Sequence, residues 1–268
     1  MAVTRRGYIF CAFLLSVLSI LLIVVAAASD SWVVSSASES GQELDSQLRY
    51  GLFTGVWEDY TLITPVMSTL HMTCVPGKNA CALSCKTTRE ARITEVEALA
   101  NGYRPTVTCT SVITVDTENP LSTPPVISFI FYLFLLLVLF LQLLFAIFSA
   151  GLAIMNSTKN PTEPIFGLPG CLWANVISLI LGTAVLLMFG IYWATSTLQD
   201  HLAFSFVALG SYGLSPSLGY SYWLLIVATA ASLLNIVLLQ LREYMLERDP
   251  PPPTLKVENH SDGTIFLY

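Results

Sequence analysis

Four long apolar runs constrain this chain more than any other feature of its sequence. They cover residues 8–29, 126–150, 170–194 and 222–241, and none contains Asp, Glu, Lys, Arg or His. A helix needs about 20 apolar residues to cross a hydrocarbon core of roughly 30 Å. In lipid the backbone polar groups must be paired within the segment, which favours helices. The pattern therefore predicts an all-α membrane bundle of four transmembrane helices.

The charged residues are collected between these runs. They make up only 11% of the chain, whereas soluble domains carry about 25%. Ionisable side chains at membrane depth are typical of pumps, transporters and voltage sensors. Their absence from the runs argues against those classes, and we interpret the helices as packing elements.

The first run has one alternative interpretation. Arg5 and Arg6 precede it, and the alanines at 26–28 resemble the cleavage site of a signal peptide. However, the apolar stretch from Tyr8 to Ala28 has 21 residues, whereas the apolar region of a signal peptide has about 7 to 15. Length therefore favours a retained helix.

Basic residues in the short connecting segments predict the orientation. Lys or Arg occurs in the segments at both ends of the chain and between the second and third runs, but not in 195–221. Cytoplasmic segments carry such an excess of positive charge. We therefore expect a multi-pass protein of the plasma membrane with both termini in the cytoplasm. The expected cytoplasmic segments are 1–7, 151–169 and 242–268, and the expected outer segments are 30–125 and 195–221.

Two glycosylation sequons fall inside the predicted cytoplasmic segments. They begin at Asn156 and Asn259. Because only segments outside the cytoplasm are modified in this way, neither asparagine is expected to carry a glycan.

Four of the six cysteines lie in the long outer segment: Cys74, Cys81, Cys85 and Cys109. An even number in an oxidising compartment predicts two disulfides. A zinc site of four thiolates would need a reducing compartment and tighter paired spacing. Four cysteines allow three connectivities, and the sequence does not choose among them. We expect no metal and no cofactor.

The same outer segment is expected to fold as a loop domain of strands plus a short helix. Thr87 and Glu90 have capping-box spacing, which predicts a helix over 88–100. Alternation of Thr, Val and Ile predicts a strand over 106–114 that carries Cys109. Weaker strand candidates are residues 32–35 and 48–53.

The sequence contains no recognisable catalytic pattern. Its histidines, at positions 71, 201 and 260, are isolated from one another, and a histidine base would need a partner that the sequence does not supply. The outer segment is acidic on balance and has no basic patch for nucleic acid. We therefore predict that the protein is not an enzyme and does not bind nucleic acid.

The C-terminal tail is a candidate docking segment. It becomes polar after Leu246, contains four consecutive prolines at 250–253, and ends in an apolar run. Apolar residues at the last and third-last positions, here Tyr268 and Phe266, can add as a strand to a PDZ groove. An unstructured end is the alternative.

A family resemblance is carried by two short strings in the outer segment. Residues 40–45 read Ser-Gly-Gln-Glu-Leu-Asp, and residues 50–55 read Tyr-Gly-Leu-Phe-Thr-Gly. Together they closely resemble the clarins, a family of small four-span membrane proteins of sensory cells. The order of segments and the Gly-Leu-Pro-Gly stretch at 167–170 fit the same family. The residues of the family motif are Gly41, Gln42, Glu43, Leu44, Asp45, Tyr50, Gly51, Leu52, Phe53 and Gly55.

A more distant resemblance connects the chain to the claudin-like superfamily. Trp32 followed by Gly51-Leu52-Phe53 is similar to the tryptophan and Gly-Leu-Trp signature of that superfamily. The resemblance implies a left-handed four-helix bundle with a claudin-like extracellular sheet. Phe53 replaces the second tryptophan, and no cysteine follows within three residues. The outer cysteines must therefore pair differently from those of claudins.

The clarin resemblance implies a non-enzymatic scaffold that organises a membrane complex at a junction, a synapse or an actin-rich projection of sensory cells. Membrane lipid and protein partners are implied, the latter through the outer loop and the tail. The alternative is an auxiliary subunit or pore-former of an ion channel in the claudin-like superfamily. A membrane enzyme is a second, less favoured rival.

Overall fold

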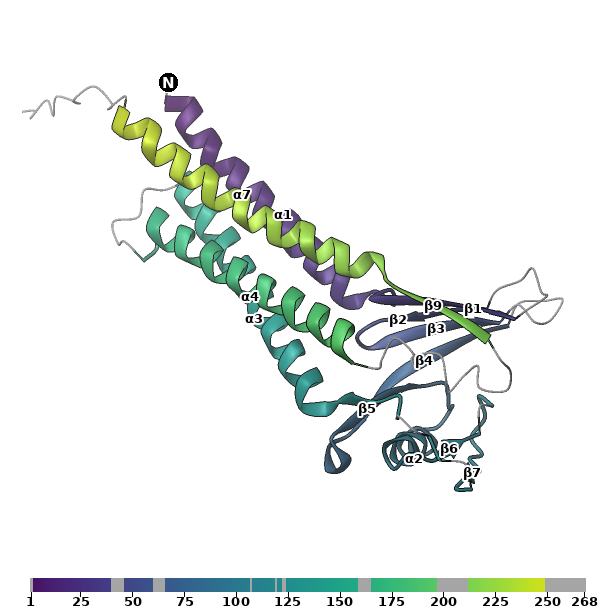
Figure 1. Cartoon of the computed structure of the whole chain (residues 1–268). Coiled ribbons are helices and arrows are strands. Elements are labelled where there is room, and N and C mark those ends of the chain that lie inside the picture. Colours follow the sequence, from purple (N-terminus) through teal and green to yellow (C-terminus); the bar gives the residue numbers. More distant parts are fainter. Residues whose placement is uncertain are drawn as a thin grey trace, which may run out of the picture.

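Four membrane-length helices and one sheet make up the computed structural model, which describes residues 2–39, 46–59, 66–106, 108–118, 120–121, 124–158, 165–196 and 212–248. Each predicted run corresponds to one helix that is long and apolar enough to cross a membrane. The helices lie side by side, and the sheet sits at one end of them (Figure 1). The chain is therefore a multi-pass membrane protein. The helices are α1 (Ala2–Ala28), α3 (Phe129–Thr158), α4 (Leu168–Thr195) and α7 (Tyr220–Arg248).

An antiparallel sheet of seven strands accompanies the four-helix bundle, so the fold is not purely all-α, and the sheet matches the expected claudin-like loop of strands only loosely. The order of its strands is β8-β5-β4-β3-β2-β1-β9. The two weak strand candidates overlap β1 and β2 by three residues each, at 33–35 and 48–50, whereas the sequence did not predict the others. The strands are β1 (Val33–Glu39), β2 (Ser46–Tyr50), β3 (Thr54–Asp59), β4 (Val66–Val75), β5 (Ala80–Ser84), β8 (Ile127–Ser128) and β9 (Tyr212–Leu218).

Strand β9 joins the two segments that were predicted to lie outside the membrane. It belongs to the short segment after α4, yet it pairs with β1 along the whole length of both strands. It lies at the edge of the sheet, where a proline such as Pro216 is tolerated because its missing N–H can face away from the neighbouring strand. The connection from α4 to α7 is thereby joined to the strand that continues from α1.

The predicted short helix is present, but its cap differs from the prediction. Helix α2 spans Arg89–Ala100. Its N-cap is Thr88, whose hydroxyl accepts a hydrogen bond from the Ala91 amide at 3.3 Å. The prediction that Thr87 caps the helix is therefore wrong, and the N-cap lies one residue later.

The strand predicted over 106–114 is wrong. Two-residue strands flank this segment instead, with β6 (Arg104–Pro105) paired to β7 (Val115–Asp116). Between them the Thr106 amide donates to the Thr114 carbonyl at 2.9 Å, and the Thr106 hydroxyl bonds the same residue. Threonine side chains that bond nearby backbone compete with sheet pairing in this way.

The two faces of the sheet have different neighbours. Side chains alternate between the faces, and one face joins the outer ends of the helices in the main core, with Trp32, Leu48 and Leu70 buried there. On the other face, Ala80 and Ala82 of β5 pack with Val96 and Leu99 of α2.

Polar side chains join the helices inside the bundle. The Asn175 side-chain amide donates to the Ser149 hydroxyl at 2.6 Å. The Asn235 side-chain amide donates to the Ser16 hydroxyl at 3.0 Å and to the side-chain oxygen of Asn175, Oδ1, at 3.2 Å. These bonds connect all four membrane helices, each contributing about 1 kcal/mol or less.

Candidate functional site

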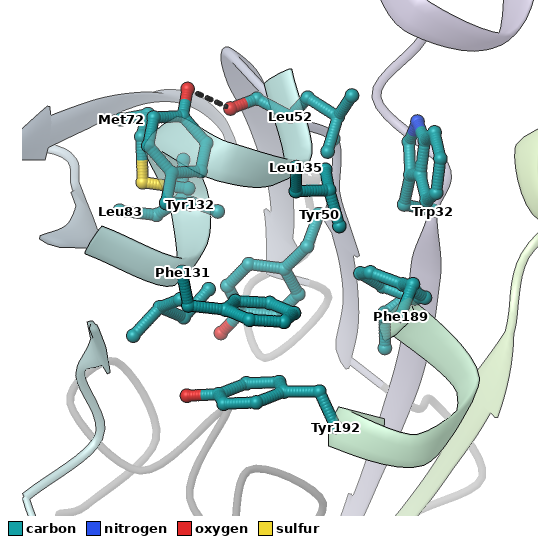
Figure 2. Close-up of a pocket in the computed structure, with 13 residues that line it drawn as sticks. Trp32, Tyr50, Leu52, Met72, Leu83, Phe131, Tyr132, Leu135, Phe189 and Tyr192 are labelled. Atoms are coloured by element: carbon teal, nitrogen blue, oxygen red, sulfur yellow. Dashed lines mark hydrogen bonds between the residues drawn. The ribbon is translucent and has the colours of Figure 1, made fainter. Parts of the chain in front are cut away.

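The junction between the sheet and the helices is built around Trp32. Its side chain is 1% exposed, and its indole N–H donates to the Ala26 carbonyl in the last turn of α1 at 2.7 Å. The ring packs edge-on against Phe189 of α4, with ring centroids 4.9 Å apart (Figure 2). The Trp32 amide donates to the Tyr50 carbonyl at 2.7 Å, and its carbonyl accepts from the Gly219 amide at 2.9 Å. One residue thus links α1, α4, β2 and the start of α7.

The Gly51 turn packs backbone against backbone. The Gly51 amide donates to the Thr54 carbonyl at 2.8 Å. A Cβ on Gly51 would overlap the Ser29 carbonyl oxygen and would lie 2.6 Å from the Thr54 carbonyl oxygen. Gly55 is restricted in the same way by the Arg49 carbonyl oxygen, at 2.6 Å. Close backbone packing therefore explains why glycine stands at positions 51 and 55 of the motif.

The two residues that follow Gly51 have different roles. Leu52 is buried, and its carbonyl accepts a hydrogen bond from the Tyr132 hydroxyl of α3 at 2.8 Å. Phe53 is 50% exposed. The Phe53 ring is therefore available to other molecules.

The remaining site predictions lie outside the described residues. They are the motif residues Gly41, Gln42, Glu43, Leu44 and Asp45, and the tail candidates Phe266 and Tyr268. They stay predictions.

The four outer cysteines form two disulfides. Cys74 and Cys81 are register partners on β4 and β5, with Cα atoms 4.0 Å apart. Cys85 follows β5 and joins Cys109 in the loop between β6 and β7, with Cα atoms 5.1 Å apart. The connectivity that the sequence leaves open is therefore given by the hairpin register and by the position of this loop.

A buried charged pair supports the second disulfide. Lys86 and Glu95 are each 1% exposed. The Lys86 ammonium donates to the carbonyls of Thr106 and Thr108, which lie shortly before Cys109 in the chain. Glu95 accepts a hydrogen bond from the Ser84 hydroxyl. Burial lowers the pKa of Lys86 and raises the pKa of Glu95, and the attraction between them opposes both shifts. The pair holds the 106–114 loop against β5.

The sheet and α2 together, which we call the outer domain after the predicted orientation, also expose several large apolar side chains. Val66 and Met67 begin β4, at the end of the sheet away from the helices, and are 46% and 66% exposed. Phe53 and Val112 are exposed elsewhere on the domain. Nearby, Arg49 and Glu58 form an ion pair at 2.6 Å. In the described ranges, no three His, Cys, Asp or Glu side chains lie close enough to hold a metal ion.

Comparison with known proteins adds no relative. No protein-family model matches the chain, and no curated protein matches it either. The clarin resemblance therefore depends on the motif residues and the order of segments.

Replacing Gly51 with alanine should destabilise the outer domain. The added Cβ would meet two carbonyl oxygens at 2.6 Å or less, and overpacking typically costs about 1–3 kcal/mol and occasionally more. Thermal unfolding of the purified protein and its amount at the cell surface should both fall. Gly77→Ala is the matched control, because nothing lies within 4 Å of its added Cβ. Equal stability of the two variants would contradict the packing argument.

Removing the second disulfide should cost more stability than removing the first. Cys85 and Cys109 are 24 residues apart, whereas Cys74 and Cys81 are 7 apart and already paired by β4 and β5. Loop-closure entropy alone makes the difference about 1 kcal/mol. Thermal unfolding of Cys85→Ser/Cys109→Ser should show the lower midpoint, compared with Cys74→Ser/Cys81→Ser. The opposite order would show that the 106–114 loop contributes little to the fold.

Proposed function

We propose that this chain is a clarin-like, non-enzymatic tetraspan protein of the plasma membrane that organises a membrane complex in sensory cells, at a junction, a synapse or an actin-rich projection. The observation that supports this most is the single sheet formed by both outer segments and fixed to the helices. Such a sheet is suited to presenting a surface to partners.

The rigidity of the outer domain supports a binding role. Strand β9 pairs with β1 along its whole length, and Trp32 contacts both α1 and α4. Two disulfides fix the other side of the sheet. A surface that is ordered before association loses less conformational entropy when it binds. The outer domain is therefore proposed as the contact surface.

The apolar tip of β4 is the proposed centre of that surface. Met67 and Val66 are exposed, and they pair with Glu58 and Asp59 at the end of β3 that is farther from the Gly51 turn. Large apolar side chains surrounded by polar ones commonly anchor protein interfaces. The tail, with Phe266 and Tyr268, is proposed to bind a PDZ scaffold on the cytoplasmic side.

The hydrogen bonds inside the bundle are the reason we favour an organiser over a pore within one copy of the chain. Asn175 and Asn235 hydrogen-bond between helices with Ser149 and Ser16, and all four side chains are buried. Direct contacts of this kind hold the four helices together in the described part of the bundle. The proposed role in a channel complex is therefore that of a partner beside the pore.

The proposed orientation can be tested with an engineered sequon. Tyr103→Thr places a threonine two positions after Asn101, which completes a sequon, and Asn101 is exposed at the end of α2. If the outer domain faces away from the cytoplasm, this variant should gain a glycan that glycosidase removes. Gel mobility of the unchanged chain should not respond to the enzyme, because its sequons at Asn156 and Asn259 would face the cytoplasm. A glycan on the unchanged chain, or none on the variant when it reaches the cell surface, would reverse the orientation.

The proposed contact surface can be tested with a charge at its centre. Met67→Glu should remove partners recovered after cross-linking intact sensory cells with a reagent that does not cross membranes, because a buried carboxylate in an interface is unfavourable. Thr69→Glu is the matched control, since it adds the same charge to an exposed position on the same face of β4. Identical sets of partners for both variants and the unchanged chain would exclude the β4 tip as the contact.

A further inference from the structure

A cavity lies where the sheet meets the outer ends of α3 and α4. Its volume is about 40 Å³, and its walls are almost entirely apolar. Aromatic rings from β2, α3, α4 and the connection between α1 and β1 surround it, including Trp32, Tyr50, Phe131, Phe189 and Tyr192 (Figure 2). Phe131 and Tyr192 are partly exposed and stack with ring centroids 4.2 Å apart. They form the rim of the cavity at the seam between α3 and α4.

One polar group on the cavity wall has no partner. The Tyr50 hydroxyl is buried and makes no hydrogen bond within the described part of the chain. Its side chain extends from β2 toward Phe131 of α3 (Figure 2). Burial raises the pKa of Tyr50 well above its usual value, so the group remains a hydroxyl that can donate and accept.

The other polar atoms around the cavity are already satisfied. The Tyr132 hydroxyl donates to the Leu52 carbonyl at 2.8 Å, and the Trp32 indole donates to the Ala26 carbonyl. The Tyr192 hydroxyl is hydrogen-bonded to the Ser128 backbone. An occupant of the cavity therefore meets one free hydrogen-bonding group and otherwise apolar surface.

Water fits these walls poorly. The volume would hold about three water molecules, but a buried water needs two to four polar partners, and the wall supplies only one group. A glycerolipid or a ceramide headgroup would bring several polar atoms to the same single hydroxyl. A sterol carries one hydroxyl on a rigid apolar body, which matches the wall in number and kind.

The depth of the cavity in the membrane also fits a sterol. Phe131 lies in the first turn of α3, and Phe189 and Tyr192 lie in the last two turns of α4. The cavity is therefore at the membrane–water interface, where aromatic side chains collect. We infer that this cavity binds the hydroxyl-bearing end of a sterol, with the Tyr50 hydroxyl as its hydrogen-bond partner and the sterol body passing the Phe131–Tyr192 rim. This inference does not depend on the proposed organising function.

The test uses the full chain in lipid nanodiscs with a photoreactive cholesterol analogue. Labelling should map to peptides that contain Phe131 or Tyr192, and cholesterol should compete. Tyr50→Phe should weaken cholesterol competition roughly fivefold to tenfold, because one hydrogen bond is lost. Without sterol, its unfolding midpoint should be equal to or above that of the unchanged chain, because an unpartnered buried hydroxyl is removed.

Two controls separate a hydroxyl-specific site from general disturbance. Tyr132→Phe removes a hydroxyl that lines the same cavity but is already bonded to Leu52, and it should leave cholesterol competition unchanged. Cholestane, which lacks the hydroxyl, should compete equally in the unchanged chain and in Tyr50→Phe. Competition unaffected by Tyr50→Phe, labelling elsewhere in the bundle, or stronger competition by diacylglycerol than by cholesterol would each overturn the inference.

Discussion

The backbone at Ser31 and Trp32 is the connection on which the rest of the structure depends. Here α1 ends and the sheet begins, and the backbone of the two residues bonds to two other segments, β2 and the start of α7. The Trp32 amide reaches Tyr50, and the carbonyls of Trp32 and Ser31 accept from Gly219 and Ser221 at 2.9 and 3.2 Å. Because backbone bonds backbone here, the position of the sheet relative to α1 and α7 is fixed without long side chains. The close approach also explains why glycine is needed nearby.

What could be predicted from the sequence was determined by local chemistry. Apolar stretches of about 20 residues without ionisable side chains are long enough to cross a membrane as helices, so all four helices were predicted. Helix α2 was found from its apolar spacing. By contrast, β9 depends on a partner about 180 residues away in sequence, and its Pro216 is unfavourable for a strand until an edge position is available. The 106–114 error has the same origin, because alternating Thr and Val specify a strand only where a neighbouring strand is present.

The candidate site follows the same division between local and long-range information. Gly51 was selected through a resemblance, whereas its physical reason, contact with the Ser29 carbonyl, requires the folded turn. The cysteine pairing depends on hairpin register, which four cysteines cannot specify alone. Lysine and glutamate are usually surface residues, and only the fold brings Lys86 and Glu95 under the loop that carries Cys109. No sequence pattern identifies in advance a lysine that is buried and hydrogen-bonded in this way.

Two buried polar groups without partners in the described residues differ in what surrounds them. Gln142 is fully buried in the bundle, but a Cβ at Gly182 would lie only 2.6 Å from its amide nitrogen, so helix packing fills its surroundings. The Tyr50 hydroxyl has open volume beside it and apolar rings around that volume. An unpaired group in a packed core is a cost of packing, whereas an unpaired group beside a cavity can recover its hydrogen bond from a ligand. A sterol bound at Tyr50 would contact β2, α3 and α4 together, and membrane composition would then influence how firmly the outer sheet is held on the bundle.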